Sequence, residues 1–282
     1  MLDIDLHCHS NVSDGILTPA KLISRAAQRG VEMLALTDHD DVAGLDEARS
    51  AAFEKNITFI NGVEISVSWR NRTIHILGLN IDPDYQPLFD GLAAIRAGRA
   101  QRAQNIAVEL EKAGIGGSLE GAYAYVGERG LIGRTHFARY LVEKGYAKDT
   151  KSVFKKYLVK GKPGYTHHEW AALSEAITWI AGSGGRAVIA HPARYNLGKN
   201  VLNDLLDEFS ALGGCALEVI SASHTAQQVE IFAAHAKSRN LFASCGSDFH
   251  GPGESFYDLG RLPELPSGCV PVWHDWNTFQ NN

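Results

Sequence analysis

The chain has few cysteines, and no two of them lie close together. Cys8, Cys215, Cys245 and Cys269 are spread over 282 residues and form no CxxC pair. The simplest interpretation is that the thiols are reduced and that the protein is cytoplasmic.

Long apolar runs and an excess of basic residues are also missing. No run of 18 apolar residues occurs, and the first residues lack the basic and apolar regions of a secretory signal, so we expect neither a membrane span nor a leader. The formal net charge is -5, which argues against binding to long nucleic acid, because clustered Lys and Arg supply most of the affinity in such complexes. A locally positive site for a small anion stays compatible with this charge. No feature of the sequence indicates a stable protein partner.

Apolar runs alternate with helical patterns over most of the chain. We expect strands over 3–7, 31–37, 57–61, 63–68, 73–79, 186–190, 215–220 and 241–246, and helices over 19–28, 43–55, 87–113, 169–182, 200–211 and 225–239. Repeated strand–helix units predict an α/β fold with a largely parallel sheet. The rhythm breaks in a Gly-rich, aromatic and basic stretch. We therefore expect three parts: residues 1–99, an inserted and mainly helical lid at 100–165, and residues 166–282.

The twelve histidines say more about function than the residue types that the chain lacks. His7 and His9 lie two residues apart at the end of a predicted strand, so both rings point to the same side, as two ligands of one metal ion would. Taken alone, such a pair is common among surface and core histidines. His75, inside an apolar strand, would by itself be an ordinary core residue.

Other polar side chains occupy equivalent positions. His39, His191, Asp248 and His250 also follow predicted strands, and the carboxyl ends of parallel strands meet on one face. Asp14 lies in the loop after the first strand, while Glu64 and His75 belong to neighbouring strands. Imidazole and carboxylate ligands suit Zn, Mn or Fe. Nine such side chains exceed the ligands of one ion, so they predict two or three ions with a bridging carboxylate.

Seven short motifs carry a resemblance to a known family. In chain order they are HCHS at 7–10, SDG at 13–15, TDHD at 37–40, GVEIS at 62–66, IHILG at 74–78, AHP at 190–192 and GSDFH at 246–250. Together they resemble the PHP family, the polymerase and histidinol phosphatase superfamily, over about residues 3–255. The resemblance implies a distorted (β/α)7 barrel with a trinuclear metal centre, for which we expect Mn²⁺, with Zn²⁺ or Fe²⁺ as alternatives.

The resemblance also implies a ligand set. His7, His9, Glu64 and Asp248 would hold the first ion; Glu64, His75 and His191 the second; Asp14, His39 and His250 the third. Glu64 would then bridge two ions.

The expected chemistry is phosphoester hydrolysis. A water shared between two ions loses a proton near neutral pH and becomes the nucleophile, and no Ser or Cys nucleophile motif is present. We expect Glu64 and His191 to be catalytic through the metal centre, and Asp40 to orient groups or carry a proton. Asp40 could equally be a loop carboxylate that caps the next helix.

Substrate recognition needs cations outside the metal centre. Arg134, followed by Thr135 and His136 in the insert, matches the subgroup of the family that acts on small nucleotides, and a guanidinium fits a phosphate in a bidentate manner. Arg99 and Arg102 lie on the long helix, where a solvated surface is the plainer interpretation. Arg194 and His224 follow predicted strands and are further candidates. His167, His168 and His274 have no supporting pattern and are expected at the surface.

The leading hypothesis is a phosphomonoesterase that removes the 3'-phosphate from nucleoside 3',5'-bisphosphates, leaving the nucleoside 5'-monophosphate. One alternative is a 5'→3' exoribonuclease on short 5'-phosphorylated RNA. Others are a phosphatase for a different metabolite, such as histidinol phosphate, and a non-catalytic metal-bound module.

Overall fold

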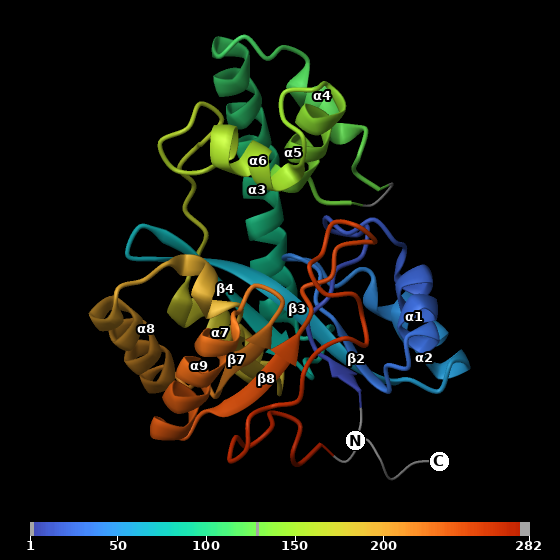
Figure 1. The fold of residues 1–282 in the computed structure, drawn as a ribbon, viewed down its shortest axis with the longest axis vertical. Coiled ribbons are helices and arrows are strands. Elements are labelled where there is room, and N and C mark those ends of the chain that lie inside the picture. Colours follow the sequence, from blue (N-terminus) through green and yellow to red (C-terminus); the bar gives the residue numbers. More distant parts are fainter. Residues whose placement is uncertain (1–2, 128–129, 277–282) are drawn as a thin grey trace.

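The computed structural model describes residues 3–127 and 130–276. A curved sheet forms its centre, with strands in the order β1-β2-β3-β4-β6-β7-β8 (Figure 1). The strands are β1 (Ile4–Asp5), β2 (Met33–Leu36), β3 (Thr58–Trp69), β4 (Arg72–Leu79), β6 (Arg186–Ile189), β7 (Ala216–Ser221) and β8 (Phe242–Gly246). Just past β1, the amide of Leu6 donates to the carbonyl of Cys245 at 3.0 Å, so the two ends of the sheet nearly close into a barrel. The predicted α/β barrel is confirmed.

The sheet is parallel except at β4. This strand runs antiparallel to both β3 and β6. The cause is a two-residue hairpin: Arg70 and Asn71 have φ of 45° and 60°, the positive values that a tight type I′ connection requires.

One prediction about the strands was wrong. Residues 57–61 and 63–68 were expected as two strands, but β3 continues through Gly62. A Cβ at this position would lie 2.7 Å from Thr37 Cγ2 and 2.8 Å from the carbonyl oxygen of Leu36. Glycine is therefore present because β2 and its following loop approach closely, and it does not mark a break.

Helices cover the outside of the sheet. They are α1 (Pro19–Gln28), α2 (Leu45–Glu54), α7 (Leu173–Gly182), α8 (Lys199–Ala211) and α9 (Ala226–Ser238). α1 begins as expected, because Thr18 Oγ1 accepts from the Lys21 amide and Pro19 takes the first helical position. α7 begins later than expected, since Ala171–Ala172 form the short strand β5 beside β3.

The long helix α3 (Gln86–Lys112) runs from the barrel into the inserted segment (Figure 1). Its 27 residues span about 40 Å at 1.5 Å per residue. Leu88, Leu92 and Ile95 pack into the main core of the barrel. Ala103, Ile106 and Leu110 belong to a separate apolar cluster, together with residues of the insert.

Short helices make up the rest of the inserted segment. They are α4 (Ser118–Tyr123), α5 (Arg134–Glu143) and α6 (Thr150–Val153), which continues as a π-helical turn, Phe154–Leu158. The expected divisions 1–99, 100–165 and 166–282 also include residues 1–2, 128–129 and 277–282, which lie outside the described residues. No helix within the described ranges is long and apolar enough to cross a membrane.

Candidate metal centre

Nine side chains converge at one end of the barrel. His7 and His9 follow β1, Asp14 and His39 lie in loops after β1 and β2, Glu64 and His75 lie within β3 and β4, His191 follows β6, and Asp248 and His250 follow β8. Their ligand atoms form four overlapping groups, with the atoms of each group within 4.8 Å of one another. The groups are His7, His9 and Asp248; His7, Glu64 and His191; His39, Glu64 and His75; and His9, Asp14, His39 and His250. The expected nine-residue cluster is thus assembled in space.

Glu64 lies at the centre of this cluster and is fully buried. Its Oε1 is 2.8 Å from His75 Nδ1 and 2.9 Å from His191 Nε2. Its Oε2 is 3.4 Å from His7 Nε2 and 3.3 Å from His9 Nε2. The two oxygens therefore face two different sets of histidines.

Asp14 faces His39 and His250, and Asp248 faces His7 and His9 from a second side. Asp14 Oδ1 is 3.2 Å from His250 Nε2 and 3.8 Å from His39 Nε2. Asp248 Oδ1 is 3.4 Å from His7 Nε2 and 3.2 Å from His9 Nε2.

Two opposing effects set the pKa values in this cluster. Burial favours the neutral form of each group, whereas a neighbouring group of opposite charge favours the charged form. Burial favours the neutral carboxyl, yet His39 and His75 hold the pKa of Glu64 well below its usual range. Burial, joined by the neighbouring His39 and His191, lowers the pKa of His75 to about 4, although Glu64 acts in the opposite direction. For His250, burial is outweighed by Asp14 and Asp248, which raise its pKa to about 9. The carboxylates are therefore ionised while most of the cluster is closed to water.

These residues fit divalent ions. Glu64 Oε2 and Asp14 Oδ1 are buried and accept no hydrogen bond from the described residues. Buried acceptors without a donor are costly unless a cation supplies the missing interaction. Imidazole nitrogens and carboxylate oxygens are the donors that Zn, Mn and Fe take.

The backbone around the cluster adopts uncommon conformations. His191 has φ of 29°, Asp248 of 52° and Asp40 of 51°, although none of them is glycine. Such conformations cost about 1–3 kcal/mol each and occur mainly at functional sites.

Three arginines border the cluster. Arg99 and Arg102 on α3 and Arg134 at the start of α5 line a pocket of about 60 Å³, together with Asp14, His39 and His75. Arg99 and Arg102 are each only 8% exposed, so the expectation of a solvated surface was wrong. Their guanidinium carbons lie 4.9 Å and 5.1 Å from the ring centroid of Trp170, which holds both in place. Burial, then Arg134 and Arg99, lower the pKa of Arg102.

Asp40 stands outside the nine-residue cluster. Its Oδ2 pairs with Arg99, and its Oδ1 accepts from the amide of Ser66 at 2.6 Å. It does not cap the next helix, whose N-cap is Gly44. The role of Asp40 as a proton carrier stays a prediction, and its contacts position Arg99.

The other residues that were predicted to bind substrate fall into two groups, one that adjoins the cluster and one that does not. Thr135 Oγ1 donates to Asp14 Oδ2 at 2.7 Å, and Arg194 pairs with Asp248, so both adjoin the cluster. His136 is 1% exposed and its Nδ1 accepts from the Gly133 amide at 2.9 Å, which caps α5. His224 Nδ1 lies 2.9 Å from the Val219 carbonyl, against the loop after β6. The contacts of His136 and His224 give their predicted roles in substrate binding no support.

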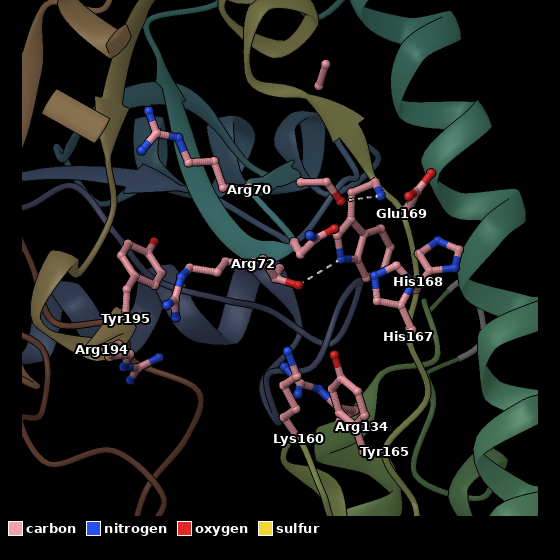
Figure 2. Close-up of a pocket in the computed structure, with 15 residues that line it drawn as sticks. Arg70, Arg72, Arg134, Lys160, Tyr165, His167, His168, Glu169, Arg194 and Tyr195 are labelled. Carbon is pink, nitrogen blue, oxygen red and sulfur yellow. Dashed lines mark hydrogen bonds between the residues drawn. The ribbon is translucent and has the colours of Figure 1, made fainter. Parts of the chain in front are cut away.

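A larger cavity of about 860 Å³ adjoins the arginine pocket and shares Thr73, Arg134 and Trp170 with it. Figure 2 shows Arg70 and Arg72, Arg194 and Tyr195, and Lys160 and Tyr165 around this space. His167 and His168 also line it; His167 is exposed, as expected, and His168 is half-buried.

Comparisons with known proteins agree with this geometry. Residues 5–222 match the model of the PHP domain. The chain is 50% identical over 275 residues to a Chromobacterium violaceum protein named 3',5'-nucleoside bisphosphate phosphatase, covering 98% of this chain and 96% of that one. It is 45% identical over 279 residues to the 5'-3' exoribonuclease Rnm of Escherichia coli, covering 98% and 94%. A solved structure of an amidohydrolase from C. violaceum, with bound sulfate and no metal, superposes with a TM-score of 0.93 at 51% identity, covering 96% and 94%.

The chain belongs to the PHP family. With the clustered histidines and carboxylates, this makes it a metal-dependent phosphoesterase.

A carboxylate that was not predicted from the sequence contacts two of the candidate ligands, His7 and His191. Glu218 on β7 is fully buried; its Oε1 lies 3.0 Å from His7 Nδ1, and its Oε2 accepts from the His191 amide at 2.5 Å. The sequence did contain a signal, because Glu218 is the one charged residue in the strand ALEVIS, Ala216–Ser221. A carboxylate on the outer nitrogen of a ligating histidine fixes the ring and its tautomer.

We therefore expect Glu218→Gln to weaken metal binding by about 10–100-fold, because the amide holds His7 less firmly. Metal content after equilibration in metal-buffered solution measures this directly. Glu208→Gln is the matched control, since Glu208 accepts from Trp69 Nε1 at 2.8 Å and lies outside the cluster. Wild-type metal affinity in Glu218→Gln would show that Glu218 does not support the centre.

Proposed function

We propose that this enzyme removes the 3'-phosphate from nucleoside 3',5'-bisphosphates, giving the 5'-monophosphate and phosphate. The proposal rests on two phosphate sites of different kinds that lie side by side. One is the cluster of carboxylates and histidines, where bound metal ions would attract a phosphate. The other is the pocket of Arg99, Arg102 and Arg134. A nucleoside with two phosphates fits such a pair of sites, and the similar protein from C. violaceum bears the name of this activity.

The arginine pocket is built in advance for a phosphate. Asp40 and Trp170 orient Arg99, and Trp170 also supports Arg102, whose Nε has no hydrogen-bond partner among the described residues. The buried Arg99 and Arg102 and the half-buried Arg134, against the buried carboxylates of Asp40 and Asp14, leave an excess of positive charge. A phosphate dianion would offset that charge and accept bidentate hydrogen bonds.

In this proposal His7, His9, Glu64 and Asp248 would hold the first ion; Glu64, His75 and His191 would hold the second; and Asp14, His39 and His250 would hold the third. The ions, which we propose are Mn²⁺, supply Lewis acidity and an activated water. Glu64 and His191 would contribute to catalysis by holding the second ion, and Glu64 would also hold the first. Asp40 positions Arg99, and Thr135 orients Asp14. Hydrolysis breaks the bond between phosphorus and the 3'-oxygen, which takes up a proton as water adds to phosphorus.

We further propose that residues 100–165 act as the recognition lid, between barrel parts 1–99 and 166–282. Arg134 and Thr135 come from this segment and reach the arginine pocket and Asp14. The separate apolar cluster of the insert supports this division, because it gives the segment a core of its own.

A second candidate activity is 5'→3' exoribonuclease action on short 5'-phosphorylated RNA. The observation in its favour is the cavity of about 860 Å³, which is open beyond the arginine pocket. The chemistry is the same, since the bond between phosphorus and the 3'-oxygen breaks in both cases. The E. coli relative bears the name of this activity.

Turnover of an adenosine 3',5'-bisphosphate by the Mn²⁺-loaded enzyme tests the proposal. We expect equal amounts of adenosine 5'-monophosphate and phosphate, identified by chromatography. Adenosine 3'-monophosphate as the product, or no turnover while a 5'-phosphorylated oligonucleotide is cleaved, would refute it. Adenosine 3'-monophosphate offered as substrate is the control, and without its 5'-phosphate it should react much more slowly.

We expect Arg134→Ala to lower kcat/KM for the bisphosphate by about 10- to 150-fold. A charge-assisted hydrogen bond contributes roughly 1.5–3 kcal/mol, and about 1.4 kcal/mol is tenfold. Hydrolysis of p-nitrophenyl phosphate, which has no second phosphate, should fall far less. Equal losses on both substrates would show that Arg134 serves the chemistry or the fold instead of reading the second phosphate.

A further inference from the structure

The insert forms hydrogen bonds and ion pairs with the barrel at two loops, one after β1 and one after β8. The amide of Leu131 donates to the Val12 carbonyl at 3.0 Å, and Thr135 Oγ1 donates to Asp14 Oδ2 at 2.7 Å. Apart from the continuous helix α3, every such contact between the insert and the barrel in the described part of the chain ends on Val12, Asp14 or Glu254.

Arg139 on α5 joins these two loops. Its Nε and Nη2 donate to Oε1 and Oε2 of Glu254 at 2.9 Å and 2.7 Å, and its Nη2 also donates to the Asp14 carbonyl at 2.7 Å. A bidentate pair of this kind fixes the orientation of its partners as well as their distance. The Arg139 side chain is only 8% exposed, so the loss of Glu254 would leave a buried guanidinium without compensation.

Each of the two loops carries a ligand of the proposed third ion. Asp14 is one ligand, and His250 lies four residues before Glu254, with its amide donating to Ser255 Oγ at 2.7 Å. The loops also contact each other, since the Ile16 amide donates to the His250 carbonyl at 2.7 Å. Asp14 Oδ1 and His250 Nε2 lie 3.2 Å apart. A movement of either loop would therefore separate these two ligands.

The ligands of the other two proposed ions are held from within the barrel. Glu64 and His75 lie in strands, and Glu218 contacts the His7 ring and the His191 amide. Within residues 3–127 and 130–276, no hydrogen bond or ion pair of these ligands reaches the insert; the set is His7, His9, Glu64, His75, His191 and Asp248. The third ion is thus the one whose ligands depend on contacts with the insert.

We infer that Arg139 is a positioning residue for the third ion, and that binding of this ion and docking of the insert favour each other. The inference rests on the proposed function, which assigns Asp14, His39 and His250 to that ion. Arg139 fixes the Asp14 and His250 loops relative to each other only while α5 lies against the barrel. Because coupling between two binding equilibria is reciprocal, the third ion in turn stabilises the docked insert. Arg134 begins the same helix, so the arginine pocket is completed together with the third site.

Binding of Mn²⁺ to the whole chain tests this inference. Equilibrium dialysis against buffered Mn²⁺ gives the number of ions per chain and the affinity for each. One variant is Arg139→Met, which keeps an apolar stem in the buried position. The second is Glu254→Gln, a milder change at the more exposed end of the pair. The control is Arg239→Met, because Arg239 forms a comparable pair with Asp207 at 2.9 Å between α8 and the end of α9.

We expect wild type to bind three ions. Both variants should bind two of them with unchanged affinity and the third about 10–100-fold more weakly, the range for loss of a residue that supports a metal ligand. Bisphosphate turnover by Arg139→Met should recover when free Mn²⁺ is raised by the same factor, which would not repair a damaged fold. Amide hydrogen exchange in α5 should slow as the third ion binds to wild type, and this protection should need more Mn²⁺ in both variants. Arg239→Met should behave as wild type.

Several results would overturn the inference. These are unchanged affinity for the third ion in both variants, equal weakening of all three ions, the same loss in Arg239→Met, or exchange in α5 that does not respond to the third ion. Wild type that binds only two ions would overturn it as well. A failure of the proposed substrate is distinguishable, because wild type would then bind three ions and leave the bisphosphate intact, while the metal affinities still decide the role of Arg139.

Discussion

One fully buried carboxylate, Glu64, organises the end of the barrel where the site lies. An isolated charge in such a place costs several kcal/mol unless cations or hydrogen-bond donors surround it. Here five imidazoles from four other segments of the chain surround the two oxygens, those of His7, His9, His39, His75 and His191. The reversed strand β4 is part of this arrangement, because it brings His75 beside β3, which carries Glu64.

Negatively charged and positively charged side chains gather in two adjoining regions. Carboxylates gather at the barrel end, where divalent ions fit, while guanidinium groups gather between α3 and the insert. Asp40 joins the two regions, since its backbone amide donates to the Glu64 carbonyl at 2.9 Å and its side chain pairs with Arg99. A shift of the loop after β2 would therefore move the candidate metal ligand His39 and the proposed phosphate site together. This coupling explains why the loop tolerates the uncommon backbone conformation of Asp40.

The sequence predicted the fold and the cluster well because their signals are local. Thr18-Pro19 marks a helix start, and ligands that directly follow apolar runs must meet at one end of a parallel sheet. Glu218 was missed because it touches His7 across 211 positions of the chain, which no spacing rule captures. Arg99 and Arg102 were expected in solvent because their burial depends on Trp170, a residue about 70 positions away. Gly62 indicates a break by composition, and only the approach of the loop after β2 shows why it is needed.

We propose that Glu64 bridges two metal ions within one phosphoesterase centre. A crystal structure of Mn²⁺-loaded protein, with data collected at the manganese absorption edge, tests it most directly. We expect anomalous peaks about 3.5–4 Å apart on opposite oxygens of Glu64, one beside His75 and His191 and the other beside His7 and His9, with a third between Asp14 and His250. A single ion, or ions bound while Glu64 contacts fewer than two of them, would contradict it.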